Sequence, residues 1–121
     1  MNTVQRRRYS RISFHGSATF QVGLGQWPCE VLDLSLRGAL IAAAIPNIAI
    51  DTPCLLELRL DEDACLSMEG HVAHHCADHI GIVCDVTDLD SVSHLRRLLI
   101  LNIGDVSLLD REFSTMLAEH G

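Results

Sequence analysis

The sequence contains no lysine, and all nine of its basic residues are arginines. It also has no acidic residue among its first 29 positions, although Arg6, Arg7, Arg8 and Arg11 lie there. Residues 1–29 therefore carry a charge of +4, whereas the rest of the chain, with five arginines and sixteen acids, carries −11. A long polyanion bound to the arginines near the amino terminus would extend over the acidic remainder of the chain, which repels phosphates. This distribution therefore favours a compact anion as the ligand and argues against DNA or RNA as a partner.

Long apolar runs are missing from the sequence as well. No stretch approaches the ~18 to 20 apolar residues that a membrane-spanning helix needs. The amino terminus also lacks the apolar segment of a secretory signal. These absences predict a cytoplasmic protein without membrane insertion.

Cysteine pairs are absent too. The five cysteines are an odd number and include no CxxC pair, which argues against a disulfide framework. No signature of an activated nucleophile surrounds any of them, so the sequence predicts no thiol enzyme. We expect most of them to be reduced and buried as small apolar residues. The cysteines are Cys29, Cys54, Cys65, Cys76 and Cys84.

The length of 121 residues fits one domain with a single core. Short alternations of apolar and polar residues dominate the first two thirds of the chain. The clearest is Leu55–Leu60, where Glu57 and Arg59 interrupt the leucines with a period of two. About six short strands at near-regular spacing predict a mainly β fold, a small antiparallel barrel or sandwich. The expected strands cover residues 13–22, 27–34, 39–45, 55–60, 65–75 and 79–86.

From residue 88 onward the apolar residues recur with the period of a helix. Asp88 or Asp90 can cap a first helix that ends at Gly104, and Asp105 can cap a second one. The second helix has a single apolar stripe, which predicts that it packs on the body of the protein. The first helix is apolar over a wider arc, so we expect part of it to contact the second helix or a partner protein.

Two short motifs carry groups that suit a guanine nucleotide. Arg7 and Arg11 stand four residues apart, and arginine binds phosphate oxygens or the O6/N7 edge of guanine through two parallel donors. Downstream, the segment from Asp33 to Gly38 offers a carboxylate for the N1 and N2 hydrogens of guanine, the hydroxyl of Ser35 and a flexible glycine. Taken singly, the first motif is also typical of a solvated tail and the second of an ordinary turn.

Taken together, the two motifs resemble those of the PilZ domain family. In this sequence Arg7 and Arg11 match the RxxxR motif, and Asp33, Ser35 and Gly38 match the (D/N)xSxxG motif. Residues 69–72 and 81–84 and the ending DLDSVSHLRRLLILNIGD are similar to the later strands and helices of single-domain members. The resemblance implies a six-stranded antiparallel β-barrel with C-terminal helices. Its parts are an arginine-rich arm over residues 1–12, a barrel over residues 13–87, and helices over residues 88–121 packed on the barrel within the same domain.

The resemblance also implies a function, which is the binding of cyclic di-GMP without catalysis and without a cofactor. In such proteins the arm wraps over the ligand, often an intercalated dimer, and the second motif lies beneath it. Arg6 and Arg8 are then candidates for additional contacts. The expected protein is a receptor or adaptor whose arm changes conformation on binding and which signals to an unidentified effector protein in motility or biofilm control. One departure is His74, which stands where relatives often have an aromatic residue.

The histidines around Cys76 invite a metal site, which we do not expect. On a regular strand His71 and His75 face one way and His74 and Cys76 the other, and the spacing fits no common zinc template. The alternative functions are a constitutive protein-interaction module without nucleotide binding, a nucleic-acid binder, and a thiol or metal enzyme.

Overall fold

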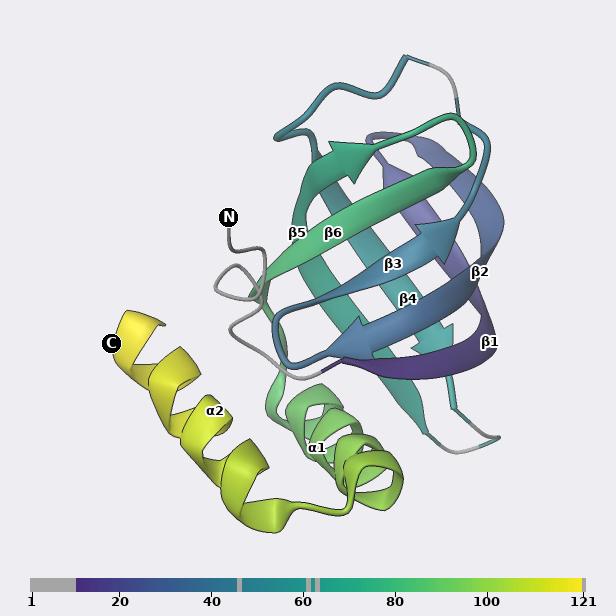
Figure 1. Ribbon diagram of the computed structural model, residues 1–121. Helices are drawn as coiled ribbons and strands as arrows, with labels where there is room; N and C mark the ends of the chain where they lie inside the picture. The colour runs from purple at the N-terminus through teal and green to yellow at the C-terminus, as the bar shows by residue number, and fades with distance from the viewer. Residues whose placement is uncertain (1–10, 46, 61, 63, 121) are drawn as a thin grey trace.

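The structure, a computed structural model, describes residues 11–120 apart from residues 46, 61 and 63. Six strands are followed by two helices, which confirms the predicted fold class (Figure 1). The elements are β1 (Ile12–Val22), β2 (Gly25–Ser35), β3 (Gly38–Ala42), β4 (Pro53–Arg59), β5 (Cys65–His75), β6 (His79–Val86), α1 (Leu89–Ile103) and α2 (Val106–His120).

The strands form a closed antiparallel barrel in the order β1-β2-β3-β6-β5-β4. Hairpins join β1 to β2, β2 to β3, β4 to β5, and β5 to β6. Two further pairings close the sheet, β1 with β4 and β3 with β6. The connection between β3 and β4 therefore crosses one end of the barrel, as Figure 1 shows at the top.

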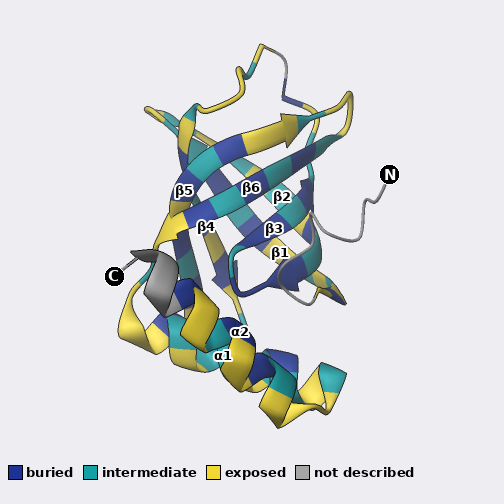
Figure 2. Cartoon of the chain, turned by 60° about the vertical axis from the view of Figure 1, so that its left-hand side comes forward, coloured by how far each residue is buried: buried dark blue, intermediate teal, exposed yellow. Residues whose placement is uncertain are grey.

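The core fills the interior of the barrel, because alternate residues of each strand point inward. In β4 this pattern is regular, with Leu56 and Leu58 fully buried between exposed Glu57 and Arg59. Figure 2 shows a similar alternation of buried with intermediate or exposed residues along β5 and β6. The largest fully buried side chains in the barrel are Phe20, Leu34, Ile41, Leu56, Leu58, Leu66, Met68 and Ile80.

Both helices lie at the opposite end of the barrel from the β3–β4 connection (Figure 1). The α1 helix packs on β5 through Leu95 and Leu99, and the backbone N–H of Ser67 donates to Ser91 Oγ at 2.9 Å. As predicted, α1 ends at Gly104, which adopts the left-handed conformation with φ 78°. Asp105 then caps α2 by accepting a hydrogen bond from the backbone N–H of Leu108 at 3.0 Å.

The α2 helix is attached mainly to α1. Leu109 is fully buried, and Arg96 of α1 donates to Asp110 of α2 at 2.6 Å. Among the described residues, neither helix has the length and apolar character needed to cross a bilayer.

Candidate ligand-binding face

The two predicted motifs meet at the start of β1 and the end of β2. Arg11 directly precedes β1, and Ser13 of that strand pairs with Asp33 of β2. The other arginines of the arm, Arg6, Arg7 and Arg8, lie outside the described residues.

An ion pair joins the motifs directly. Arg11 Nη1 donates to Asp33 Oδ1 at 2.5 Å, and the two side chains are 35% and 24% exposed. The guanidinium carries five N–H donors in a planar fork, and this contact uses only one of its nitrogens. The ion pair thus joins two residues that are 22 positions apart in the sequence, on the outer surface of the barrel.

Ser35 and Gly38 shape the turn between β2 and β3. Ser35 is only 3% exposed, and its Oγ accepts a hydrogen bond from the backbone N–H of Arg37 at 3.3 Å. At Gly38 a Cβ atom would stand 2.1 Å from the backbone carbonyl oxygen of Ile82 on β6. Glycine is therefore needed here for the close approach of two backbones rather than for a positive φ angle.

A β-bulge turns Asp33 outward. Val31 pairs with Ile41 and Asp33 pairs with Leu40, which leaves Leu32 as the extra residue on β2. Val31 and Ile41 are fully buried, so the next pair, Asp33 and Leu40, faces the outside of the barrel. Bulges commonly re-aim a side chain beside a functional site.

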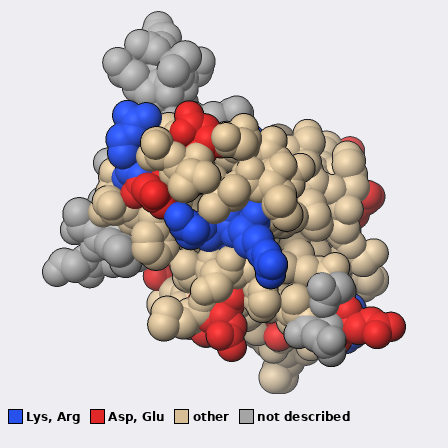
Figure 3. All heavy atoms as spheres, turned by 90° about the horizontal axis from the view of Figure 1, so that it is seen from below, with Lys and Arg blue, Asp and Glu red and all other residues tan. Residues whose placement is uncertain are grey.

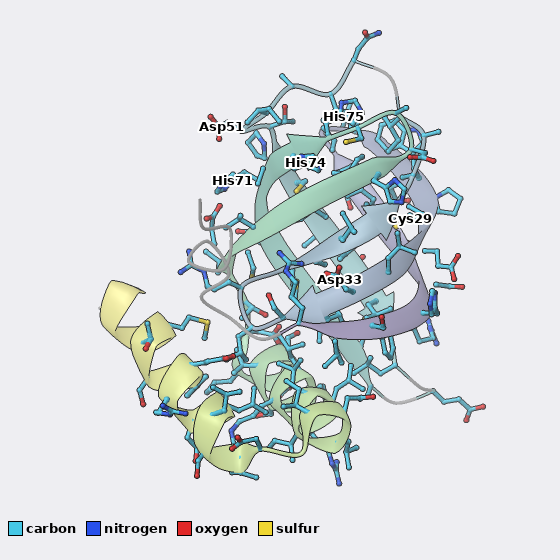
Figure 4. All side chains as sticks on the ribbon, in the orientation of Figure 1. Cys29, Asp33, Asp51, His71, His74 and His75 are labelled. Atoms are coloured by element: carbon cyan, nitrogen blue, oxygen red, sulfur yellow. The ribbon has the colours of Figure 1, made fainter. Side chains whose placement is uncertain are left out.

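A second bulge on β5 corrects the predicted orientation of the histidines. Val72 pairs with Ile82 and His74 pairs with Gly81, so Ala73 is the extra residue. His74 therefore lies on the outer face with His71, whereas His75 pairs with buried Ile80 and points inward (Figure 4). The prediction that His71 and His75 share a face was wrong, because strict alternation fails at a bulge.

The two bulges place four residues in one row across the outer surface. Asp33 pairs with Leu40, Leu40 with Gly81, and Gly81 with His74. Three inter-strand steps separate the ends of this row, about 14 Å at the usual spacing of ~4.8 Å. Gly81 has no side chain, and the side chain of His74 lies close to it: a Cβ atom at Gly81 would stand 3.1 Å from the Cβ of His74. Leu40 and Gly81 were missed from the sequence because only the strand register brings them beside Asp33.

Arg37 occupies a variable position of the second motif, so the motif did not identify it as a site residue. Its backbone carbonyl accepts a hydrogen bond from the N–H of Cys84 at 2.7 Å, which ties the turn to β6. Its half-buried side chain lines a hollow of about 340 Å³ together with Asp85 of β6 and with Phe113 and Met116 of α2. The turn of the second motif is therefore adjacent to α2.

Charges of both signs are mixed on the helical end of the protein. Seen from below, arginine side chains gather near the centre of this face and acidic side chains lie around them (Figure 3). The net charge of −7 is thus not spread as a uniform negative surface. In the part of the chain that the structure describes, no three His, Cys, Asp or Glu side chains form a cluster suited to a metal ion.

Solved structures with the same fold support this architecture. The PilZ domain of CeSA from a cellulose-synthesizing bacterium is similar with a TM-score of 0.64 and 18% identity, over 75% of this chain and 95% of that one. The Bacillus subtilis inhibitor of motility, MotI/DgrA, is similar with a TM-score of 0.64 and 17% identity, over 79% of this chain. This chain spans about half of that protein, with 52% of its length covered.

The sequence itself identifies the family. A sequence model described as the PilZ domain matches residues 5–101, which include both arginines of the first motif and the whole of the second. The match therefore covers most of the chain and all six strands. The chain belongs to the PilZ domain family.

Proposed function

We propose that this protein is a receptor for cyclic di-GMP that catalyses no reaction and signals to an effector protein. PilZ domains are generally binding modules for this second messenger, and both family motifs are intact here. The observation that carries the proposal is the Arg11–Asp33 ion pair, because it brings the two motifs to one place on the outer face.

The chemistry of the ligand fits the groups on this face. Cyclic di-GMP carries two guanines and two phosphates, so it needs cationic donors and a carboxylate acceptor. Asp33 can accept the N1 and N2 hydrogens of a guanine, and the arginine fork suits a phosphate or the O6/N7 edge. Arg11 already donates to Asp33 Oδ1, so a guanine that binds both oxygens of Asp33 shares or replaces this contact.

The row from Asp33 to His74 supplies a surface for the bases. Leu40 offers an apolar contact, Gly81 adds no side chain of its own, and His74 is an exposed ring at the far end of the row. In this proposal His74 stacks on the ligand in place of the aromatic residue that relatives often have there.

The amino-terminal arm completes the proposed site. Arg7 belongs to the first motif, and Arg6 and Arg8 add positive charge for further phosphates, as an intercalated dimer of the ligand would require. The arm orders over the dianionic ligand and changes the surface offered to the effector. The proposed output is the control of motility or biofilm formation.

Isothermal titration calorimetry with cyclic di-GMP at 0.15 M salt tests the proposal. We expect Arg11→Ala and Asp33→Ala each to weaken binding roughly 10- to 100-fold, because a hydrogen bond to a charged group contributes about 1.5 to 3 kcal/mol. Arg59→Ala is the matched control, since Arg59 is an exposed arginine on β4, away from the motifs. No binding by the wild-type chain, or an equal loss in the control, contradicts the proposal.

A constitutive protein-interaction module is the second candidate, and one observation favours it. An open groove of about 740 Å³ runs between α1 and the barrel, with Phe14, Leu60, Leu98 and Leu101 among its lining residues. Leu101 is 76% exposed. The groove agrees with the expectation that the wide apolar arc of α1 contacts a partner. The calorimetric titration separates the two candidates, because the module binds no cyclic di-GMP.

A further inference from the structure

The five cysteines lie in two kinds of environment. Cys54 and Cys84 are buried and Cys29 is half-buried, and desolvation by burial is the largest cause that raises the pKa of each thiol to about 11. Cys65 and Cys76 are exposed, so the expectation that most of the cysteines are buried does not extend to these two. Cys65 begins β5 and Cys76 directly follows its last residue, which makes the two a natural pair for comparison.

Cys76 has a histidine beside its sulfur. The Sγ atom of Cys76 and the Nε2 atom of His74 are 3.1 Å apart. With Nε2 as the acceptor, the thiol donates its proton toward the imidazole, which is the arrangement that converts a weak thiol nucleophile into a thiolate. The structure shows no such histidine contact for Cys65 among the residues that it describes.

The backbone holds Cys76 in place at the end of β5. Its N–H donates to the carbonyl of His79 at 2.9 Å and closes the β5–β6 turn. The turn is tied to the end of β3, because the N–H of Ala43 donates to the carbonyl of Asp78 at 3.0 Å. These two hydrogen bonds hold the turn in place, and with it the position of Cys76 next to His74.

A hollow beside the sulfur gives small molecules access. Its volume is about 430 Å³, and Cys76, His75 and three apolar residues, Ala44, Ile45 and Ala77, line it.

We propose that Cys76 is a reactive thiol and a site of modification by hydrogen peroxide and other small electrophiles, with His74 as its base. His74 accepts the thiol proton, and the sulfur attacks one peroxide oxygen while the O–O bond breaks. The second oxygen leaves and takes up the proton as water, so the sulfur is oxidised to the sulfenic acid and the peroxide is reduced. This step does not involve cyclic di-GMP.

Limiting alkylation of the full folded chain with iodoacetamide, read by mass spectrometry of each cysteine peptide, tests the proposal. We expect Cys76 to react at least about tenfold faster than Cys65. A positioned base typically raises a reaction rate by a factor of about 10² or more, and exposure of this site to water reduces that factor. His74→Ala is expected to lower the rate at Cys76 to that of Cys65, whereas His71→Ala leaves it unchanged. Circular dichroism verifies that both variants keep the fold.

Two results would overturn the proposal. The first is equal alkylation of Cys76 and Cys65 in the wild-type chain, and the second is an unchanged rate at Cys76 in folded His74→Ala. For the oxidation, the chain is treated with hydrogen peroxide and dimedone, which traps sulfenic acids. A dimedone adduct at Cys76 that is lost in His74→Ala supports the peroxide step, and adducts distributed equally over Cys76 and Cys65 refute it.

Discussion

Replacing Gly38 with alanine tests whether this motif glycine acts through the fold. The added Cβ atom would lie 2.1 Å from the carbonyl oxygen of Ile82, more than 1 Å inside normal contact. The backbone fixes the positions of both atoms, so no side-chain rotation relieves the clash. The strands β3 and β6 must therefore separate, which weakens adjacent hydrogen bonds such as that from Cys84 N–H to Arg37 O. About two weakened bonds at ~1 kcal/mol each, together with overpacking strain, predict a loss of roughly 2 to 4 kcal/mol.

Urea unfolding followed by circular dichroism measures this loss, and a thermal scan should show a melting temperature lower by about 8 to 16 °C for a domain of this size. Gly81→Ala is the matched control, because the nearest atom to its Cβ is the side-chain Cβ of exposed His74 at 3.1 Å. We expect the control to change the stability by less than about 1 kcal/mol. An unchanged midpoint for Gly38→Ala, or an equal loss in both variants, would refute the reasoning.

Three further predictions concern the core and the helices. The free energy of unfolding is expected to fall between pH 9 and about 11, because the unfolded chain releases the thiol protons of Cys54 and Cys84 near 9.0 while the folded chain holds them to about 11. Urea titrations at several pH values should show this stability intact below pH 9. In the variant with both Cys54→Ala and Cys84→Ala, the free energy of unfolding should depend less on pH above 9. Leu99→Ala removes a fully buried side chain of α1 and should cost about 2 to 5 kcal/mol in the same assay. Arg96→Ala breaks the exposed pair with Asp110 and should cost less than about 1 kcal/mol, so a larger loss would mean that α2 depends on this contact.

The secondary structure was largely predictable because its signals are local. Leu55–Leu60 alternates with a period of two and falls almost entirely within β4. Gly104 and Asp105 mark the boundary between the helices, where one adopts a left-handed conformation and the other caps α2. The family resemblance then supplied the barrel, which the alternation alone did not distinguish from a sandwich.

The arrangement of the site was harder to predict, because it depends on pairing between strands. The motifs identified Arg11 and Asp33, but not the ion pair between them. The bulge at Ala73 leaves no mark in the sequence, since an extra residue is defined only relative to the neighbouring strand. The row that joins Asp33 to His74 depends on two such bulges and was therefore invisible before the register was known.

The closure of the barrel by the pairing of β1 with β4 limits how this protein can recruit other proteins. Each of the six described strands has a hydrogen-bonded neighbour on both sides over part of its length, so no strand is a free edge from end to end to which an incoming strand could add. Closure therefore favours recognition of this protein through side chains, loops or helices, and it disfavours cross-β growth between copies through the native sheet for the same reason.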